Sequence, residues 1–250
     1  MSTKHWLEPE YSDLGGGVGE LLSQRELRQL RYKEANRIQQ SLVAAGEKKL
    51  LVWLANRMPR AINSDHLTAI GSAGMLLAGL SYWMASWNRL GLVLATVFLA
   101  VNWFGDSLDG TLARVRNQQR PRYGFYVDHV TDTFGALFLM GGLALSGYAS
   151  PAIALGMLIA FLMLSIESYL AAHTVGDFRL SFGWFGPTEL RIVLGIGNTV
   201  LLFHPMAHVL GREYRLFDVG GVVAIASMVL IMLISAALHT ARLYREEPLA

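Results

Sequence analysis

The chain has 250 residues, enough for one membrane domain with a modest extension, and 53% of them are hydrophobic, with a mean hydropathy of +0.36. This composition is too apolar for an ordinary soluble domain of this size. The formal net charge of +2 says little by itself, and the absence of cysteine excludes a disulfide framework.

The chain begins with a polar, glycine-rich stretch. Residues 1–22 have no apolar core of the kind found in a signal peptide, so we expect a flexible leader. The run from Gly15 to Gly17 lacks the Lys-Ser/Thr pair that follows a phosphate-binding loop. The leader therefore carries no predicted site.

Residues 23–62 predict amphipathic juxtamembrane helices. A first helix is expected over residues 23–45 and a second over residues 47–58, separated at Gly46. Both are basic, and basic amphipathic helices before a membrane span usually lie in the interface against anionic headgroups. We therefore expect these charges to meet membrane lipids rather than nucleic acid.

Six apolar segments follow, and each is long enough to cross a hydrocarbon core of about 30 Å. They lie near residues 67–87, 90–112, 125–148, 151–173, 188–209 and 218–241. Pro205 should kink the fifth segment or end its regular part early. Short connections predict an all-α integral membrane protein, with a six-helix bundle over residues 63–243, a tail at 244–250 and no second domain.

Loop charge predicts the orientation, because lysine and arginine accumulate on the cytoplasmic side. With the N-terminus inside, 17 lysines and arginines lie on the inner side and only Arg89, Arg212 and Arg215 on the outer side. We therefore expect both termini and the loop at 113–124 to face the cytoplasm from the inner, cytoplasmic membrane.

Four aspartates lie in two pairs around that loop. Asp106 and Asp109 are three residues apart, and Asp128 and Asp132 are four apart. Residues at these spacings share one face of a helix, so each pair presents two carboxylates in one direction. Apolar segments before and after them place the carboxylates at a membrane boundary.

Converging carboxylates repel one another where solvation is poor, so a cation is the expected partner. Oxygen ligands favour Mg²⁺, Mn²⁺ or Ca²⁺, and no cysteine offers a softer ligand. Four carboxylates suit two ions about 3.5–4 Å apart, the usual arrangement for displacement at phosphorus, with one carboxylate left as a base. The alternative, a solvated acidic loop, does not explain why helical spacing occurs twice between membrane segments.

The aspartates belong to a longer pattern, D-x2-D-G-x2-A-R-x9-G-x3-D-x3-D. It is formed by Asp106, Asp109, Gly110, Ala113, Arg114, Gly124, Asp128 and Asp132. This pattern resembles the signature of the CDP-alcohol phosphotransferases, and the resemblance extends more loosely from about Leu67 to the last apolar segment. Two positions depart from the family: Ser64-Asp65-His66-Leu67-Thr68 replaces a Pro-Asn-x-x-Thr turn, and Pro121 replaces a Ser or Thr.

The resemblance implies a reaction and a distribution of roles. An alcohol hydroxyl would attack the β-phosphorus of a CDP-alcohol and release CMP, in phospholipid biosynthesis with Mg²⁺ or Mn²⁺. Either the CDP compound is the lipid and a small alcohol attacks, or it carries the headgroup and a lipid alcohol attacks. The resemblance assigns the metals to Asp106, Asp109, Asp128 and Asp132, and the CDP moiety to Gly110, Ala113, Arg114 and Gly124. We also expect a homodimer.

Two further features resemble the choline/ethanolamine phosphotransferase branch. His129 directly follows Asp128, and Thr188-Glu189 follows the fourth segment. The only cations available for an anionic acceptor, Arg179 and Arg191, are interpreted as a loop charge and a snorkelling side chain. The sequence thus favours a neutral acceptor.

For the base that takes the proton of the attacking hydroxyl, we predict a dyad of His129 and Glu189. His129 points about 100° around the helix from Asp128, so it can flank the metals without binding them. Glu189 opens the fifth segment on the same side, where it could accept a hydrogen bond from the imidazole. In the alternative, Glu189 only caps a helix and His129 is an interfacial polar residue. A rival base is Asp132, the assignment favoured for the wider family.

Two other functional classes fit less well. A metal or proton transporter would carry carboxylates near mid-membrane on several helices, whereas here they gather at one end beside an arginine-rich loop. A membrane-anchored binding protein with a degenerate site would have lost an aspartate, and none is lost.

Overall fold

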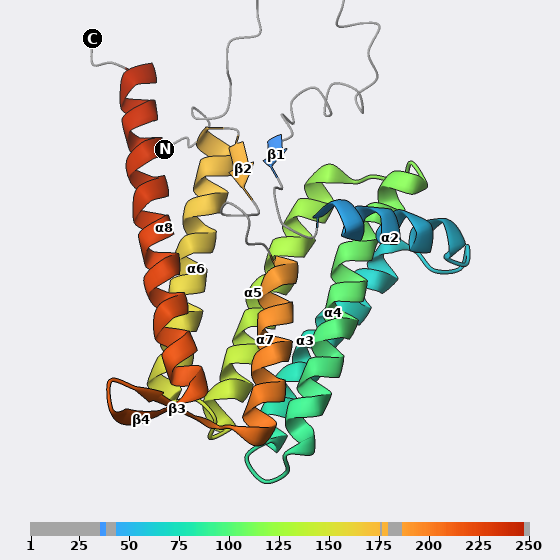
Figure 1. Cartoon of the computed structure of the whole chain (residues 1–250). Coiled ribbons are helices and arrows are strands. Elements are labelled where there is room, and N and C mark those ends of the chain that lie inside the picture. Colours follow the sequence, from blue (N-terminus) through green and yellow to red (C-terminus); the bar gives the residue numbers. More distant parts are fainter. Residues whose placement is uncertain (1–35, 39–43, 176, 180–186, 248–250) are drawn as a thin grey trace, which may run out of the picture. The chain divides into compact units, whose positions relative to one another are not determined.

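The computed structural model describes residues 36–38, 44–175, 177–179 and 187–247. These residues form seven helices and four short strands (Figure 1). In chain order the elements are β1 (Asn36–Ile38), α2 (Ala44–Arg57), α3 (Ser64–Met84), α4 (Leu90–Val115), α5 (Pro121–Leu145), α6 (Pro151–Thr174), β2 (Asp177–Arg179), α7 (Pro187–Phe203), β3 (Met206–Val209), β4 (Arg212–Arg215) and α8 (Leu216–Glu246).

Helix α3 is the element against which both aspartate-bearing helices pack. Its contact with α4 is close because both helices present glycine there: a Cβ on Gly105 would lie 2.5 Å from the backbone nitrogen of Gly71. Its contact with α5 is equally close, since a Cβ on Gly142 would lie 1.9 Å from the carbonyl oxygen of Gly79. Small residues at such positions let helix backbones approach in a membrane. Glycine packing thus brings α4 and α5 to one side of α3.

The larger of two buried clusters among the described residues lies away from the aspartates. Tyr82, Leu92 and Leu143 are fully buried there, one each from α3, α4 and α5. Tyr82 also donates a hydrogen bond of 2.8 Å to Asn198 of α7, and the Asn198 amide donates to Thr96 at 3.0 Å. A polar group in an apolar interior needs such a partner. These bonds fix α7 against α3 and α4.

Contacts at the helix ends show the directions in which the long helices run. The guanidinium of Arg116, at the end of α4, donates to the backbone oxygens of Met58 and Ile62, which lie just before α3. At the other end, the carboxylate of Asp218 at the start of α8 accepts from the backbone nitrogen of Ser150 at 2.6 Å, just before α6. Helices α3 and α4 therefore run antiparallel, whereas α6 and α8, which are separated in the chain by α7, begin at the same end.

The outward faces of the helices are apolar. Within the described residues, four helices, α3, α4, α6 and α8, are long and apolar enough to cross a membrane. Helices α5 and α7 lie at predicted spans but are not among these four, because α5 carries the charged half of the motif and α7 has only 17 residues. The predicted number of six spans is therefore not confirmed.

Several predicted boundaries need correction. Residues 36–38, predicted as helix, form the strand β1, whose backbone pairs in parallel with β2. Gly46 lies inside α2 rather than between two helices, because glycine keeps its backbone N–H and weakens a helix by only about 1 kcal/mol. Helix α8 continues to Glu246, through part of the predicted tail. The remainder of the first amphipathic helix, the leader and Ser23 lie outside the described residues.

The effect predicted for Pro205 is confirmed. Helix α7 ends at Phe203, two residues before this proline, and the chain then forms an antiparallel hairpin of β3 and β4. The short hairpin was not expected in an all-α protein. Its connecting residues, Leu210 and Gly211, both have positive φ, and at Gly211 the absence of a side chain makes that conformation inexpensive.

Orientation in the membrane remains a prediction, and it can be tested with single cysteines because the sequence contains none. Gln118, between α4 and α5, and Glu213, in β4, are both exposed. In sealed vesicles, Gln118→Cys and Glu213→Cys should react with an impermeant maleimide from opposite faces. Labelling of both from the same face would overturn the arrangement.

Candidate active site

The two aspartate pairs meet beside α3. Asp106 and Asp109 lie in the last three turns of α4, and Asp128 and Asp132 in the first four turns of α5. A small polar pocket opens between the three helices and brings three of the four carboxylates together. It is lined by Thr68, Gly71, Ser72 and Met75 of α3, Asn102, Asp106 and Asp109 of α4, and Thr131 and Asp132 of α5.

Asp109 is fixed by the start of α3. The hydroxyl of Thr68 donates to the Asp109 carboxylate at 2.5 Å, and the hydroxyl of Ser64 donates to its backbone oxygen at 2.9 Å. A capping box of Asn63 and His66 begins α3 here and so sets the position of Thr68. The segment that departs from the family's Pro-Asn-x-x-Thr turn therefore still contacts the acidic site.

Asp106 is paired with Arg191 of α7. The Arg191 guanidinium donates to the Asp106 carboxylate at 2.6 Å and to the side-chain oxygen of Asn102 at 2.8 Å. Asn102 in turn donates to the backbone oxygen of Gly71 at 3.0 Å. Because the Arg191 side chain is directed into the bundle, its interpretation as a snorkelling side chain was wrong. The side chain of Arg179, the other candidate, lies outside the described residues.

On α5, Asp128, His129 and Asp132 present ligand atoms that all lie within 4.8 Å of one another. Nδ1 of His129 is 3.6 Å from the Asp128 carboxylate. The buried His129 ring stacks on Tyr169 of α6, with centroids 4.5 Å apart, and meets Phe125 edge-on at 4.1 Å. These two rings were not predicted, because an aromatic residue in an apolar segment carries no signal of its own.

Glu189 is buried in the first turn of α7, next to Thr188. No contact described above tests the predicted dyad of Glu189 with His129, which stays a prediction. Arg191, two residues after Glu189, is a site residue whose role the sequence analysis did not predict. Its signal was available, since an arginine inside an apolar segment needs an acidic or backbone partner.

The motif glycines have open space beside them, unlike the packing glycines. A Cβ on Gly110 would meet nothing closer than the guanidinium of Arg114 at 3.5 Å, and one on Gly124 would meet nothing within 4 Å. The same helix face carries Ala113, which is half-buried. Helix packing therefore does not require glycine at either position, and the free space suits a ligand that approaches the backbone.

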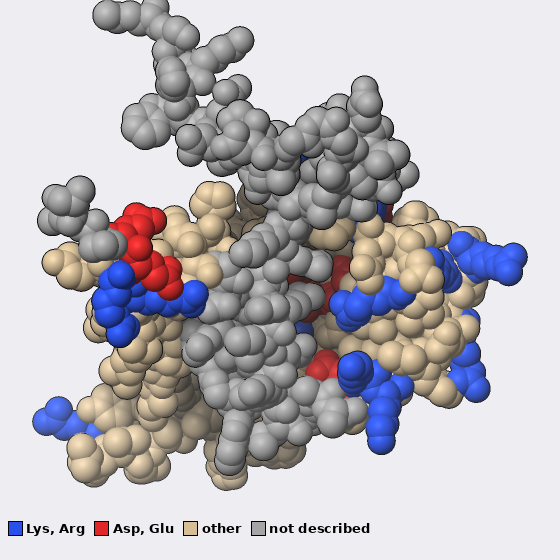
Figure 2. Space-filling model, turned by 90° about the horizontal axis from the view of Figure 1, so that it is seen from above, with Lys and Arg blue, Asp and Glu red and all other residues tan. Residues whose placement is uncertain are grey.

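Electrostatics explain why this arrangement needs a cation. The Asp132 carboxylate is repelled by the negative charges of Asp106, Asp128 and Asp109. It is attracted by the positive charge of Arg191. The pocket supplies carboxylate, hydroxyl and amide oxygens, which are the donors that Mg²⁺ and Mn²⁺ prefer. The residues present therefore fit the two predicted ions. In the view from above, lysine and arginine side chains lie beside acidic ones on part of the described surface (Figure 2).

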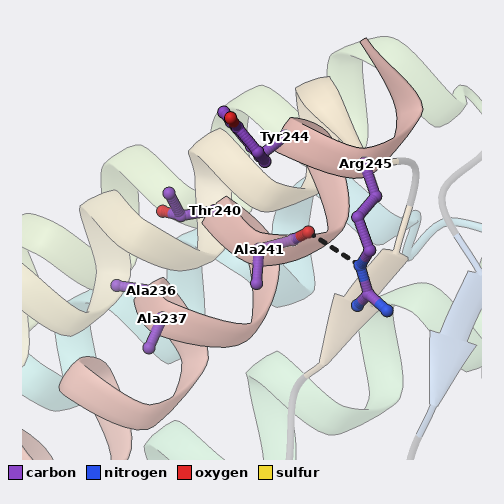
Figure 3. A pocket seen from close by; sticks show the side chains of 6 residues that line it. All are labelled: Ala236, Ala237, Thr240, Ala241, Tyr244 and Arg245. Carbon is purple, nitrogen blue, oxygen red and sulfur yellow. Dashed lines mark hydrogen bonds between the residues drawn. The ribbon is translucent and has the colours of Figure 1, made fainter. Parts of the chain in front are cut away.

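A second pocket lies on α8 and carries none of this chemistry. Figure 3 shows the residues of α8 that line it, among which Arg245 donates to the backbone oxygen of Ala241 at 3.0 Å. Apart from Arg245, Thr240 and Tyr244, its lining is alanine. It contains no carboxylate and is not a candidate for the catalytic centre.

Comparison with known proteins identifies the family of the chain that carries this acidic pocket. The family model of the CDP-alcohol phosphatidyltransferases matches residues 65–241, which contain both aspartate pairs and Arg191. The chain belongs to this family. A curated relative of this CDP-alcohol phosphatidyltransferase, archaetidylinositol phosphate synthase of Pyrococcus horikoshii, is 30% identical over 137 residues, covering 55% of this chain and 69% of the relative.

Family membership confirms the resemblance drawn from the motif. The protein is a transferase of phospholipid biosynthesis and an integral membrane protein, which takes a CDP-alcohol donor and an alcohol or lipid acceptor. The transporter and the degenerate binding protein are not supported. The choline/ethanolamine branch is not confirmed, since the relative bears a different name.

Replacing Gly110 with alanine should separate folding from donor binding. Alanine stabilises a helix interior by up to about 1 kcal/mol relative to glycine, and here its methyl group meets no backbone. We expect Gly110→Ala to unfold at an equal or higher temperature, while KM for the CDP-alcohol rises at least about fivefold because the methyl occupies ligand space.

Gly142→Ala is the matched control, because its Cβ would clash with the backbone of Gly79. This variant should lose thermal stability. A Gly110→Ala enzyme with the wild-type KM for its donor would show that the open face of α4 is not where the nucleotide binds.

Proposed function

We propose that the protein catalyses metal-dependent transfer of a substituted phosphate group from a CDP-alcohol to an acceptor hydroxyl, with release of CMP. The observation that carries this proposal is the convergence of Asp106, Asp109 and Asp132 on one polar pocket, with Asp128 beside it. The acceptor oxygen forms a bond to the β-phosphorus. The bond from that phosphorus to the oxygen bridging to CMP breaks, and the hydroxyl proton passes to a base.

Two divalent ions, Mg²⁺ or Mn²⁺, would be held by Asp106, Asp109, Asp128 and Asp132. Such ions neutralise the negative charge that develops on the phosphate oxygens during displacement. The chain contributes the orientation of its ligands: Thr68 fixes the Asp109 carboxylate, and Arg191 fixes that of Asp106. Fixed ligands need little reorganisation during the reaction, which favours catalysis.

The nucleotide would lie along the open face of α4. Gly110 and Gly124 leave space for a flat base and ribose. Ala113, which lies on the same face of α4 as Gly110, has only a small side chain and so leaves that space open. Arg114, exposed one turn beyond Gly110, is bonded to Thr111 at 3.0 Å and can present its charge to phosphate oxygens.

For the substrates, we favour a CDP-linked lipid as donor and a small polar alcohol as acceptor. The named activity of the relative, synthesis of archaetidylinositol phosphate, supports this assignment. So does Arg191, which puts a cation beside the carboxylates and could attract an anionic acceptor. The second candidate, headgroup transfer to a lipid alcohol, is supported by His129 and Glu189, whose positions in the sequence resemble the choline/ethanolamine phosphotransferase branch and which are both buried.

The function can be tested by supplying the purified protein with a panel of CDP-lipids and CDP-headgroups, each with polar and lipid acceptors, and measuring CMP release. We expect release to require Mg²⁺ or Mn²⁺. Asp106→Asn, Asp109→Asn and Asp128→Asn should each abolish it while the protein remains folded, because each loses a ligand and a charge that balances the metal. Full turnover in EDTA would refute the metal-dependent mechanism.

The base can be identified by comparing four variants. If His129 and Glu189 act together, His129→Ala and Glu189→Gln should each lower kcat by roughly 10² to 10⁴, with little change in CDP-alcohol affinity. The double variant should be little worse than either single one, because residues that act as a unit are not additive. Near-full activity of His129→Ala together with an inactive Asp132→Asn would instead identify Asp132 as the base.

A further inference from the structure

Glu47 lies in α2, outside the acidic pocket, and accepts hydrogen bonds from two helices of the bundle. Its Oε1 atom receives the indole N–H of Trp103 at 2.6 Å and the hydroxyl of Ser107 at 3.4 Å, both from α4. The same oxygen receives the hydroxyl of Thr188 of α7 at 2.8 Å. One carboxylate oxygen therefore joins α2, α4 and α7.

A simpler role for Glu47 would be to stabilise the start of α2, since an acidic residue in the first turn interacts favourably with the helix dipole. That role needs no partner on another helix. The three donors that converge on one oxygen indicate instead that the carboxylate holds separate elements together. Hydrogen bonds to a charged group are among the stronger ones in proteins.

Helix α2 packs against α4, which supports Glu47 in its position. Leu51 and Ala55 of α2 are buried in one cluster with Leu108 and Leu112 of α4. Beyond them, Arg116 of α4 donates to the backbone oxygen of Met58 at 2.9 Å, just past the end of α2. Helix α2 thus forms a fixed support from which Glu47 reaches α7.

The residues bonded to Glu47 are next to the acidic site in sequence. Ser107 follows Asp106, and Thr188 precedes Arg191 by about one helical turn. Arg191 itself bonds to Asp106 at 2.6 Å. Helices α4 and α7 are therefore connected on one side by Arg191 and Asp106, and on the other by Glu47.

We propose that Glu47 is a positioning residue, which sets the distance between the first turn of α7 and the aspartates of α4. This inference rests on the proposed function, because α7 carries Glu189 and Arg191 toward the acceptor. When the bond to Thr188 is lost, the start of α7 shifts away from α4. A misplacement of about 1 Å can cost roughly a hundredfold in rate.

Kinetics of the full-length protein in bilayers test this role. Glu47→Ala should lower kcat roughly ten- to a hundredfold and raise KM for the acceptor. KM for the CDP-alcohol should not change, because its site lies on α4 and α5. Glu47→Gln should restore most of kcat, since the amide oxygen still accepts hydrogen bonds. The exposed Lys49 of the same helix provides the control, and Lys49→Ala should behave as wild type.

Thr188→Val removes the donor from α7 with little change of shape, and it tests the same bond if Glu47→Ala does not fold. It should reproduce the loss in kcat, and adding it to Glu47→Ala should have little further effect. Wild-type kcat and acceptor KM in Glu47→Ala or in Thr188→Val would overturn the proposal. So would a Glu47→Gln variant as impaired as Glu47→Ala, because the charge rather than the bond would then matter.

A distance measurement separates this inference from the proposed function. Spin labels on Lys49→Cys of α2 and Leu190→Cys of α7, both exposed positions, report the spacing of the two helices by pulsed electron paramagnetic resonance. Glu47→Ala should broaden or lengthen the distance distribution, and Lys48→Ala should not. An unchanged distribution in Glu47→Ala would overturn the inference even if no CDP-alcohol proved to be a substrate.

Discussion

The repulsion among four carboxylates at one end of the bundle is the constraint on which the site depends. Asp106 and Asp109 on α4 and Asp128 and Asp132 on α5 come together because both helices pack closely on α3 through glycine. Such a cluster persists only with compensating positive charge and hydrogen-bond donors. Thr68 and Arg191 supply part of this compensation, and two divalent ions would supply the rest. Chemistry at a pyrophosphate follows from the same need, since its oxygens share those ions.

The sequence predicted those features that depend on local pattern. The paired spacing of the aspartates and the apolar segments around them indicated two facing helices at a membrane boundary, and the structure brings the two pairs together beside α3. Pro205 ended α7 as its ring requires. The interpretation failed where the outcome depends on a distant partner. Residues 36–38 form a strand only because residues 177–179 lie beside them. Arg191 belongs to the site because α7 turns it toward Asp106. Its place in an apolar segment indicated that it needs a partner, but no spacing along the chain identifies that partner.

The two kinds of glycine show how packing and function divide one residue type. Gly79, Gly105 and Gly142 have no room for a side chain, because a neighbouring backbone lies within the reach of a Cβ. Gly110 and Gly124 have room and are nevertheless glycine. The first group holds the helices together, so its loss should appear as lost stability. The second leaves one face of the site open, so its loss should appear as lost binding. The sequence alone does not distinguish the two groups, because both are glycine.

The central claim is that the four aspartates form one binuclear metal site. Titration of the purified protein with Mn²⁺, followed by electron paramagnetic resonance, measures this directly. Two bound Mn²⁺ per chain are expected, with spin coupling between them as for ions about 3.5–4 Å apart, and this coupling should be lost in Asp109→Asn. Failure to bind Mn²⁺, or binding and coupling that Asp109→Asn leaves unchanged, would contradict it.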